Sequence, residues 1–524
     1  MRLIGCNFTF MALCLVSFGS NAENYYWTSF HNTVYGRPGK PSDFPKFSDA
    51  YTACEAAARH QMANTDNTYV ENSIVLQALN GTSDGTPRIY SCNSATYYNS
   101  AGQMLVLPSG LLQTYRQGTS CSTGKSLNAY SGECEQSNSL IIRKQLGEPD
   151  NEINCNSPPG SAGNPINISN GNKFQVETDH IGRSIVFQRY YNGLSGLWLH
   201  TYSSKLNITN TQILLTLSDG RQAIFHRVAD TAFPELTELG RIVRVEGGWQ
   251  YTNQTNDRYT FDGNGRLIRL WPHLGMEQKI SYLSSNKLKV VTSIGDSVDV
   301  QLSKLPPYQP LKVTSGLTEI VYEYDFAQTL LSIRKKHDEH ESTRVYHYED
   351  TRNKKLLTGI TDERGVRFAS WSYDENGRAV SSEHVGGAGK TQLKYTNKAS
   401  VVINELGRSS KYNYEIISGL RRIISIKGLK SANCPASNSS YTYNNRGQIL
   451  SKTDAQGLIT TYIYNDRGLE TSRTEASGTR LARTITTEWD QTHFLPIRVI
   501  EPTRTTLYSY DDRGRELSRQ TTSH

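Results

Sequence analysis

The sequence predicts a mainly β protein: a long antiparallel β-meander, preceded by a small α+β domain that contains disulfides. Only 36% of the 524 residues are hydrophobic, while glycine (41) and tyrosine (31) are abundant, which favours short strands and turns over helical packing. From residue 166 onward, strand-like runs alternate with polar, glycine-containing turns. From about residue 249 the pattern becomes periodic, which predicts one supersecondary unit stacked many times.

The first 22 residues predict a secretory signal peptide. Arg2 supplies a positive start, residues 8–18 are apolar, and Ser20-Asn21-Ala22 is a small-x-small cleavage site. No later run reaches the roughly 18 to 20 apolar residues that a transmembrane helix needs. We therefore expect an exported protein that is secreted, periplasmic or attached to the cell surface, with no transmembrane segment.

Residues 23–155 predict a small cysteine-containing α+β domain. The run "SDAYTACEAAARHQ" is typical of a short helix that Ser48 can cap, and "SIVLQAL" and "RIYSCNSATYY" are typical of strands. The next segment, residues 156–165, is dense in proline, glycine, serine and asparagine and predicts a linker.

Six cysteines remain after signal cleavage, and an oxidising compartment favours disulfides. We expect the pairs Cys54–Cys92 and Cys121–Cys134, although six cysteines allow 15 pairings. A Cys155–Cys434 bond would join the small domain to the repeats. Zinc is disfavoured because the sequence has no Cys-x-x-Cys pair and no histidine spacing that completes a site.

Residues 166–248 predict a leader β domain and residues 249–524 predict the repeats. In the leader, "QILLTLSDGRQAIFHRV" reads as two strands around Asp219-Gly220, because Asp-Gly readily adopts the positive φ angles of tight hairpins. In the repeats, aromatic residues recur as i, i+2 pairs: Tyr259/Phe261, Tyr322/Tyr324, Tyr346/Tyr348, Trp371/Tyr373, Tyr412/Tyr414, Tyr441/Tyr443, Tyr462/Tyr464 and Tyr508/Tyr510.

One repeat unit can be built from these residues. Residues i and i+2 of a strand point to one face, so each pair lays two rings on the same side of the sheet. A glycine four residues after the second ring, as at Gly377, Gly447 and Gly468, predicts a turn with a left-handed glycine. Aspartates beside the second ring, such as Asp374 and Asp511, recur because the turn needs a side-chain acceptor.

The unit Tyr-x-Tyr-(Asp/Asn)-x-x-Gly, seen most clearly in "YSYDDRGRE" and "SYDENGRA", resembles the YD repeat of bacterial Rhs proteins and teneurins. Upstream, "GNPINISNGNKFQVETD", "FQRYYNG" and "LSDGRQAIF" resemble the uncharacterised domain that precedes these repeats in Rhs proteins. The resemblance covers about residues 163–524. It implies a β-shell that encloses a toxic domain, and because no Asp-Pro-x-Gly closing core follows the repeats here, we expect an incomplete shell.

The sequence gives no candidate catalytic, cofactor-binding or metal-binding residue. It contains no Gly-x-Ser-x-Gly elbow, no His-Glu-x-x-His and no phosphate-binding loop. The cluster His337-Asp338-Glu339-His340 is interpreted as an exposed turn. Net charge is +7 with both signs mixed along the chain, which does not indicate nucleic-acid binding.

Two functions follow from this sequence. The first is a secreted, non-enzymatic Rhs scaffold, part of a shell that encloses or presents a toxin in intercellular competition, with a separately encoded C-terminal core or toxin as partner. The alternative is a secreted or surface adhesin that binds glycans by stacking sugar rings on repeat tyrosines. The candidate stacking residues are Tyr441, Tyr443, Tyr462 and Tyr464.

Overall fold

The computed structural model describes residues 26–31, 46–47, 50–62, 67–70, 73–81, 87–107, 112–117, 125–127, 134–136, 143–149 and 160–524, except 210, 305–307, 326–327 and 429–437. The predicted signal peptide (residues 1–22), Ser48, Cys121, Cys155 and Cys434 lie outside the described residues, as do residues 156–159 of the predicted linker. Among the helices of the described part, none is long and apolar enough to span a membrane.

The N-terminal domain is α+β, as predicted. Helix α1 (Ala50–Met62) buries Ala53, Cys54, Ala57 and Ala58 against a four-stranded sheet. Cys54 is bonded to Cys92, with Cα atoms 5.6 Å apart, so this predicted disulfide is confirmed. The sheet has the order β1(Tyr26–His31)-β7(Leu112–Gln117)-β4(Pro87–Asn93)-β3(Val75–Gly81), beside the smaller sheets β2(Thr68–Tyr69)-β5(Thr96–Tyr98)-β6(Met104–Val106) and β8(Lys125–Leu127)-β9(Cys134–Gln136).

The leader consists of three small antiparallel sheets. The predicted Asp-Gly hairpin joins β16 (Gln212–Thr216) and β17 (Gln222–Val228), and Gly220 has a φ of 93°. The sheets are β10(Ser161–Ala162)-β11(Ile166–Asn167), β12(Phe174–Ile181)-β13(Val186–Asn192)-β14(Leu197–His200), and β15(Lys205–Ile208)-β16(Gln212–Thr216)-β17(Gln222–Val228)-β18(Thr231–Pro234).

The repeats form one antiparallel sheet of 26 strands in sequence order, which confirms the predicted meander. Its strands are β19(Arg241–Val245), β20(Gly248–Thr252), β21(Arg258–Asp262), β22(Leu267–Trp271), β23(Gln278–Ser284), β24(Lys287–Thr292), β25(Ser297–Leu302), β26(Pro310–Ser315), β27(Thr318–Tyr324), β28(Leu330–His337), β29(His340–His347), β30(Gly359–Thr361), β31(Arg367–Tyr373), β32(Ala379–His384), β33(Thr391–Tyr395), β34(Ala399–Ile403), β35(Ser409–Ile417), β36(Leu420–Gly428), β37(Ser439–Tyr443), β38(Ile449–Thr453), β39(Ile459–Tyr464), β40(Glu470–Glu475), β41(Arg483–Trp489), β42(Pro496–Glu501), β43(Arg504–Tyr510) and β44(Glu516–Ser523).

The repeat turns have the predicted geometry. In the turn after β31, Asp374 Oδ1 accepts hydrogen bonds from the backbone amides of Asn376 (2.9 Å) and Arg378 (3.0 Å), and Gly377 has a φ of 72°. The turn after β37 repeats this arrangement with Asn444 in place of the aspartate. In these two turns the acidic or amide residue beside the second tyrosine is therefore a turn residue, bonded to the amides two and four positions later.

The second tyrosine of the repeat pair also bonds to the backbone. In β39 the hydroxyl of Tyr464 donates to the carbonyl of Ile449 at 2.8 Å, and Ile449 is the first residue of the preceding strand β38. The same bond recurs in other pairs from Tyr324 to Pro310, Tyr443 to Ile423 and Tyr510 to Pro496, and two tyrosines outside the pairs make it as well, from Tyr282 to Leu267 and from Tyr395 to Ala379. Each hydroxyl therefore ties its strand to the strand before it.

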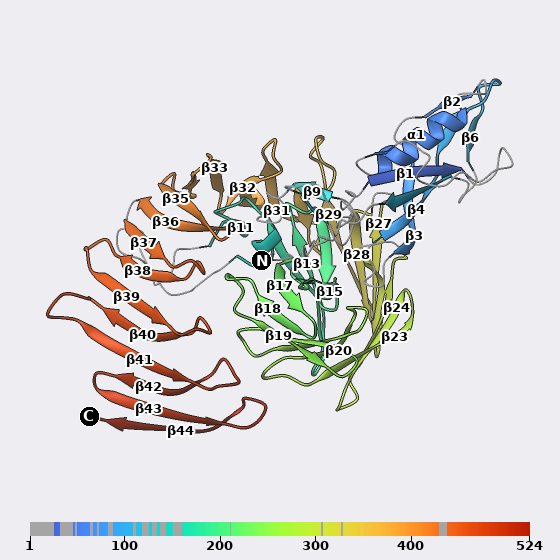
Figure 1. The fold of residues 1–524 in the computed structure, drawn as a ribbon. Coiled ribbons are helices and arrows are strands. Elements are labelled where there is room, and N and C mark those ends of the chain that lie inside the picture. The colour runs from blue at the N-terminus through green and yellow to red at the C-terminus, as the bar shows by residue number, and fades with distance from the viewer. Residues whose placement is uncertain are drawn as a thin grey trace, which may run out of the picture.

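The sheet curves around the leader (Figure 1). The largest buried cluster contains leader residues such as Phe187 and Trp198 together with repeat residues from Ile242 to Leu393. A smaller cluster packs Ile168 of the leader against Tyr412 and Tyr441. The leader strands thus fill the inside of the curve, while β39–β44 continue beyond it (Figure 1).

Candidate functional site

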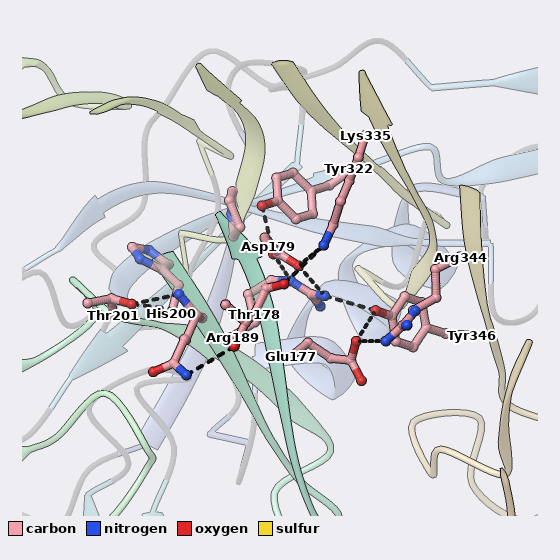
Figure 2. A network of polar contacts seen from close by, with 12 residues as sticks. Glu177, Thr178, Asp179, Arg189, His200, Thr201, Tyr322, Lys335, Arg344 and Tyr346 are labelled. Carbon is pink, nitrogen blue, oxygen red and sulfur yellow. Dashed lines mark hydrogen bonds and ion pairs between the residues drawn. The ribbon is translucent and has the colours of Figure 1, made fainter. Parts of the chain in front are cut away.

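One face of β12 is a row of polar residues turned toward the repeats. Lys173, Gln175, Glu177 and Asp179 are spaced two apart, so their side chains leave the same side of the strand. They meet side chains of β27, β28, β29 and β31, as the following contacts show. We call this row and its partners the leader seam; Figure 2 shows its central part.

The centre of the leader seam is a buried ion pair. Arg189 of β13 contacts Asp179 through Nε–Oδ2 (2.5 Å) and Nη2–Oδ1 (3.2 Å), and the two side chains are 0% and 1% exposed. The Tyr322 hydroxyl donates to Asp179 Oδ2 at 2.8 Å, while Arg189 Nη2 donates to the Tyr346 hydroxyl at 2.9 Å. Because a buried charge is tolerated only when it is paired and hydrogen-bonded, these contacts hold the leader in one position.

Electrostatics and aromatic rings reinforce this ion pair. Burial opposes the charge on Arg189, but the adjacent Asp179 carboxylate raises the pKa of the guanidinium overall. Burial raises the pKa of Tyr322, and the charge of Asp179 adds to that shift. The guanidinium also lies 4.6 Å from the ring centroid of Trp198, a cation–π contact that stabilises a desolvated cation. Arg189 therefore stays charged and the tyrosine stays a hydrogen-bond donor.

A second carboxylate extends the leader seam to β29. Glu177 forms an ion pair with Arg344, which also binds Glu363 through Nη2 at 3.0 Å. The Tyr346 hydroxyl lies 3.4 Å from Glu177 Oε2 and also accepts a hydrogen bond from Arg189, the partner of Asp179. Tyr346 therefore links the two carboxylates of β12. Lys335 of β28 completes this group by donating to the backbone carbonyl of Thr178 at 3.0 Å.

The start of the row is a fully buried lysine. Lys173 is 0% exposed, and its amine lies 4.3 Å from the ring centroid of Trp371 in β31. Burial lowers the pKa of Lys173 well below its ordinary value, although the charge of Glu177 opposes the shift. Desolvation thus favours the neutral amine at this position.

The leader seam was missed in the sequence because its pairs are distant along the chain. Asp179 and Tyr322 are 143 residues apart, and Glu177 and Arg344 are 167 apart. Polar residues at alternate positions of a strand normally face water. One local signal indicates the ion pair. Glu177 and Asp179 lie two residues apart on one strand, and Arg189 lies on the next strand of the same hairpin, so the opposite charges face each other.

A second long-range contact joins the far repeats to the start of the sheet. The turn between β41 and β42, residues 490–495, lies against the turn between β20 and β21. Asn256 Oδ1 accepts the backbone amide of Phe494 at 2.8 Å, and Asn256 Nδ2 donates to the Phe494 carbonyl at 3.4 Å. We call the contacts of residues 490–495 with β19–β21 and their connecting turns the closing seam.

Arginines and a histidine complete the closing seam. Arg241 donates to the Thr492 carbonyl, and Arg258 Nη2 lies 3.2 Å from His493 Nε2. An arginine can only donate, so that histidine nitrogen accepts and the other ring nitrogen faces Asp490 Oδ1 at 3.0 Å. Burial opposes ionisation of Asp490, but hydrogen bonds from the backbone amides of His493 and Thr492 lower its pKa to about 2. The sheet has therefore turned back far enough to contact its own first strands.

The four tyrosines expected to stack on glycans are largely covered. Tyr441 and Tyr462 are 6% and 9% exposed, while Tyr443 and Tyr464 are half-buried with their hydroxyls bonded to backbone carbonyls. The strand β38 separates the two pairs. Their ring faces are used in the sheet, and glycan stacking stays a prediction.

The remaining sequence candidates can also be located. Residues 337–340 lie at the exposed turn between β28 and β29, as expected. Within the described residues, no group of three or more histidine, cysteine, aspartate or glutamate side chains could hold a metal ion. The side chain of Cys134 and all of Cys121 lie outside what the structure describes, so that disulfide stays a prediction.

Comparison with solved structures finds a similar fold in crystal structures of TcdB2–TccC3. One has a TM-score of 0.35 and 13% identity and matches 84% of this chain but 25% of that chain. The complex with Cdc42 has a TM-score of 0.35 and 14% identity over 66% of this chain and 20% of that one. This chain thus spans about a quarter or less of those chains. No curated protein matches the chain.

Two protein families match the sequence directly. The RHS repeat family matches residues 443–480, which contain strands β38, β39 and β40 and the turns between them. A domain of unknown function, DUF6531, matches residues 163–225, which contain the leader strands from β11 to β16. Both matches agree with the repeat geometry and with the leader packed inside the curved sheet. The chain therefore contains an RHS repeat segment and, upstream of it, a segment that matches DUF6531.

Proposed function

We propose that this chain is an exported, non-enzymatic scaffold that forms part of the wall of a shell, and that the shell encloses or presents a toxin in intercellular competition. The observation that carries the proposal is the closing seam. A 26-stranded sheet that returns to its own first strands makes a wall with an inside and an outside, which an open sheet does not provide.

The distribution of buried residues supports the same role. The leader packs against the repeats as far as Leu393 in the largest cluster and as far as Tyr441 in the smaller cluster around Ile168. Tyr508 and Tyr510 in β43 are only half-buried, and their rings stack on each other with centroids 6.3 Å apart. Such a partly apolar wall suits contact with another polypeptide. We propose that this polypeptide is a separately encoded Rhs core or toxin.

A protection experiment tests this function. The full chain is purified from its organism of origin, and polypeptides that copurify are identified by mass spectrometry and exposed to protease. We expect a copurifying polypeptide that resists digestion in the wild type and becomes sensitive when Arg258→Glu opens the closing seam. The control is Arg334→Glu, because Arg334 pairs with Glu341 at the exposed surface.

Three outcomes would contradict the proposal. Cells that lack the gene would compete with their neighbours as well as the wild type does, or the purified chain would carry no polypeptide at all. If the copurifying polypeptide were equally sensitive to protease in the wild type and in Arg258→Glu, it would lie outside the wall. In that case the chain would be a binding surface and not a container.

A further inference from the structure

Lys173, Gln175 and Glu177 form a connected line of three groups in the leader seam. The amine of Lys173 donates to the backbone carbonyl of Phe174 and, at 2.9 Å, to Gln175 Oε1. Gln175 Nε2 in turn donates to Glu177 Oε1 at 2.9 Å. An amine, a carboxamide and a carboxylate therefore follow one another along residues 173–177, and the amine lies against the ring of Trp371.

The orientation of the carboxamide is fixed by its two neighbours. The lysine amine donates and the glutamate carboxylate accepts, so rotation of the Gln175 amide by 180° would set donor against donor and acceptor against acceptor. The carbonyl of Gln175 is therefore held against the amine, and its nitrogen is held against the carboxylate. The amine therefore lies beside the carbonyl group of Gln175, and the carboxylate lies beside the amide nitrogen that would leave.

The surroundings favour a reactive amine. Lys173 is fully buried and its charge is disfavoured by desolvation, and a neutral, desolvated lysine is a nucleophile. The carboxylate of Glu177 is 5% exposed and is held in place by Arg344 through its other oxygen. The oxygen that faces Gln175 is thus free of the arginine and can exchange a proton with the reacting groups.

We propose that Lys173 and Gln175 join in an intramolecular isopeptide bond, with Glu177 as the proton carrier. A bond forms between Lys173 Nζ and Gln175 Cδ, and the bond between Cδ and Nε2 breaks. Glu177 takes one proton from Nζ and gives it to Nε2, which leaves as ammonia. Glu177 ends unchanged, the products are a secondary amide and ammonia, and the step needs no oxidant or reductant.

The expected benefit is the removal of a buried amine. Because the two residues lie on the same strand, the bond closes a small ring and restricts few backbone dihedrals. Its main effect is that a neutral amide replaces an amine that could gain a proton inside the seam, where an unpaired charge is costly. The bond therefore makes the packing of β12 against Trp371 insensitive to protonation of Lys173.

Mass spectrometry of the purified, folded chain tests the proposal. We expect the intact mass to be lower than the sequence mass by one ammonia, after correction for disulfides and signal cleavage. Trypsin applied to the denatured chain should cut after Lys335 and fail to cut after Lys173. Fragmentation of the peptide that contains residues 173–177 should place the loss between Lys173 and Gln175.

Variants separate the chemistry from folding. Gln175→Leu removes the electrophile and should restore tryptic cleavage after Lys173. Glu177→Gln keeps both reacting groups, and we expect it to reduce the bonded fraction at least tenfold because the proton carrier is lost. Circular dichroism checks that each variant is folded. An unmodified Lys173 in the folded wild type would overturn the proposal, as would a loss of ammonia at another position or full bonding in Glu177→Gln.

Discussion

The buried pair Arg189–Asp179 allows a quantitative test of the leader seam. Asp179→Asn removes the negative charge while it keeps the shape of the side chain. Arg189 cannot lose its proton and is 0% exposed, so the variant leaves a buried cation without its partner. Breaking such a pair costs about 3–5 kcal/mol. We expect this loss to appear as local opening of the hairpin β12–β13.

Hydrogen exchange of the β13 amides measures that opening. A tenfold change in exchange rate corresponds to about 1.4 kcal/mol in the free energy of opening. Asp179→Asn should therefore speed exchange by about two to four orders of magnitude. The matched control is Asp230→Asn, because Asp230 is 78% exposed in its contact with Arg244 and such pairs contribute at most about 1 kcal/mol. The double variant Asp179→Leu/Arg189→Met should recover most of the loss, because it removes both charges.

A small effect of Asp179→Asn would refute this reasoning. If exchange in β13 changed by less than tenfold, or if the double variant were as open as the single one, the ion pair would not hold the leader in place. The position of the leader would then depend on apolar packing around Phe187 and Trp198 alone.

Three further predictions follow from single features. Tyr464→Phe should destabilise β39 by about 1 kcal/mol, because the hydrogen bond to Ile449 is lost, and hydrogen exchange of the β39 amides measures this loss. An unchanged exchange rate would show that the hydroxyl does not stabilise the strand. The double variant Cys54→Ser/Cys92→Ser should lower the free energy of unfolding of the N-terminal domain by about 4 kcal/mol, measured by urea unfolding, and should leave β39 unaffected. Burial lowers the pKa of His200 to about 4, so the unfolded state binds more protons between that pH and about 6.5; leader stability should fall as pH drops through this window. His200→Asn should reduce the dependence of leader stability on pH. An unchanged dependence would show that His200 is not the titrating group.

The repeats were predictable because their rules are local. The aromatic pair, the turn acceptor and the left-handed glycine all lie within nine residues of one another, and each recurs many times. A period of this kind can be read without knowing what the unit packs against. The hydroxyl bonds of the second tyrosines were not foreseen, although the preference for tyrosine over phenylalanine, as at Tyr464 and Tyr510, is a signal for them.

The two seams could not be predicted for a different reason. Asn256 and Phe494 are 238 residues apart, and their contact depends on the accumulated twist of some twenty strands between them. Neither Asn256 nor His493 is unusual in its local sequence. The polar row of β12 likewise has the composition of a solvent-facing strand, and only the curve of the repeats around it turns those residues into a buried network.

The tyrosine hydroxyl bonds have a consequence for how such a chain can change in length. Each bond joins a strand only to the strand before it, as Tyr464 joins Ile449 and Tyr510 joins Pro496. A duplicated stretch of 21 residues, the spacing from Tyr443 to Tyr464, would carry its own bond and its own turn. In β38–β40 a whole unit can thus be gained or lost with its local bonds intact, but the turn at residues 490–495 would then move relative to Asn256 in the closing seam. The strands that pack on the leader lack this freedom, because each of them has a fixed partner across the interior.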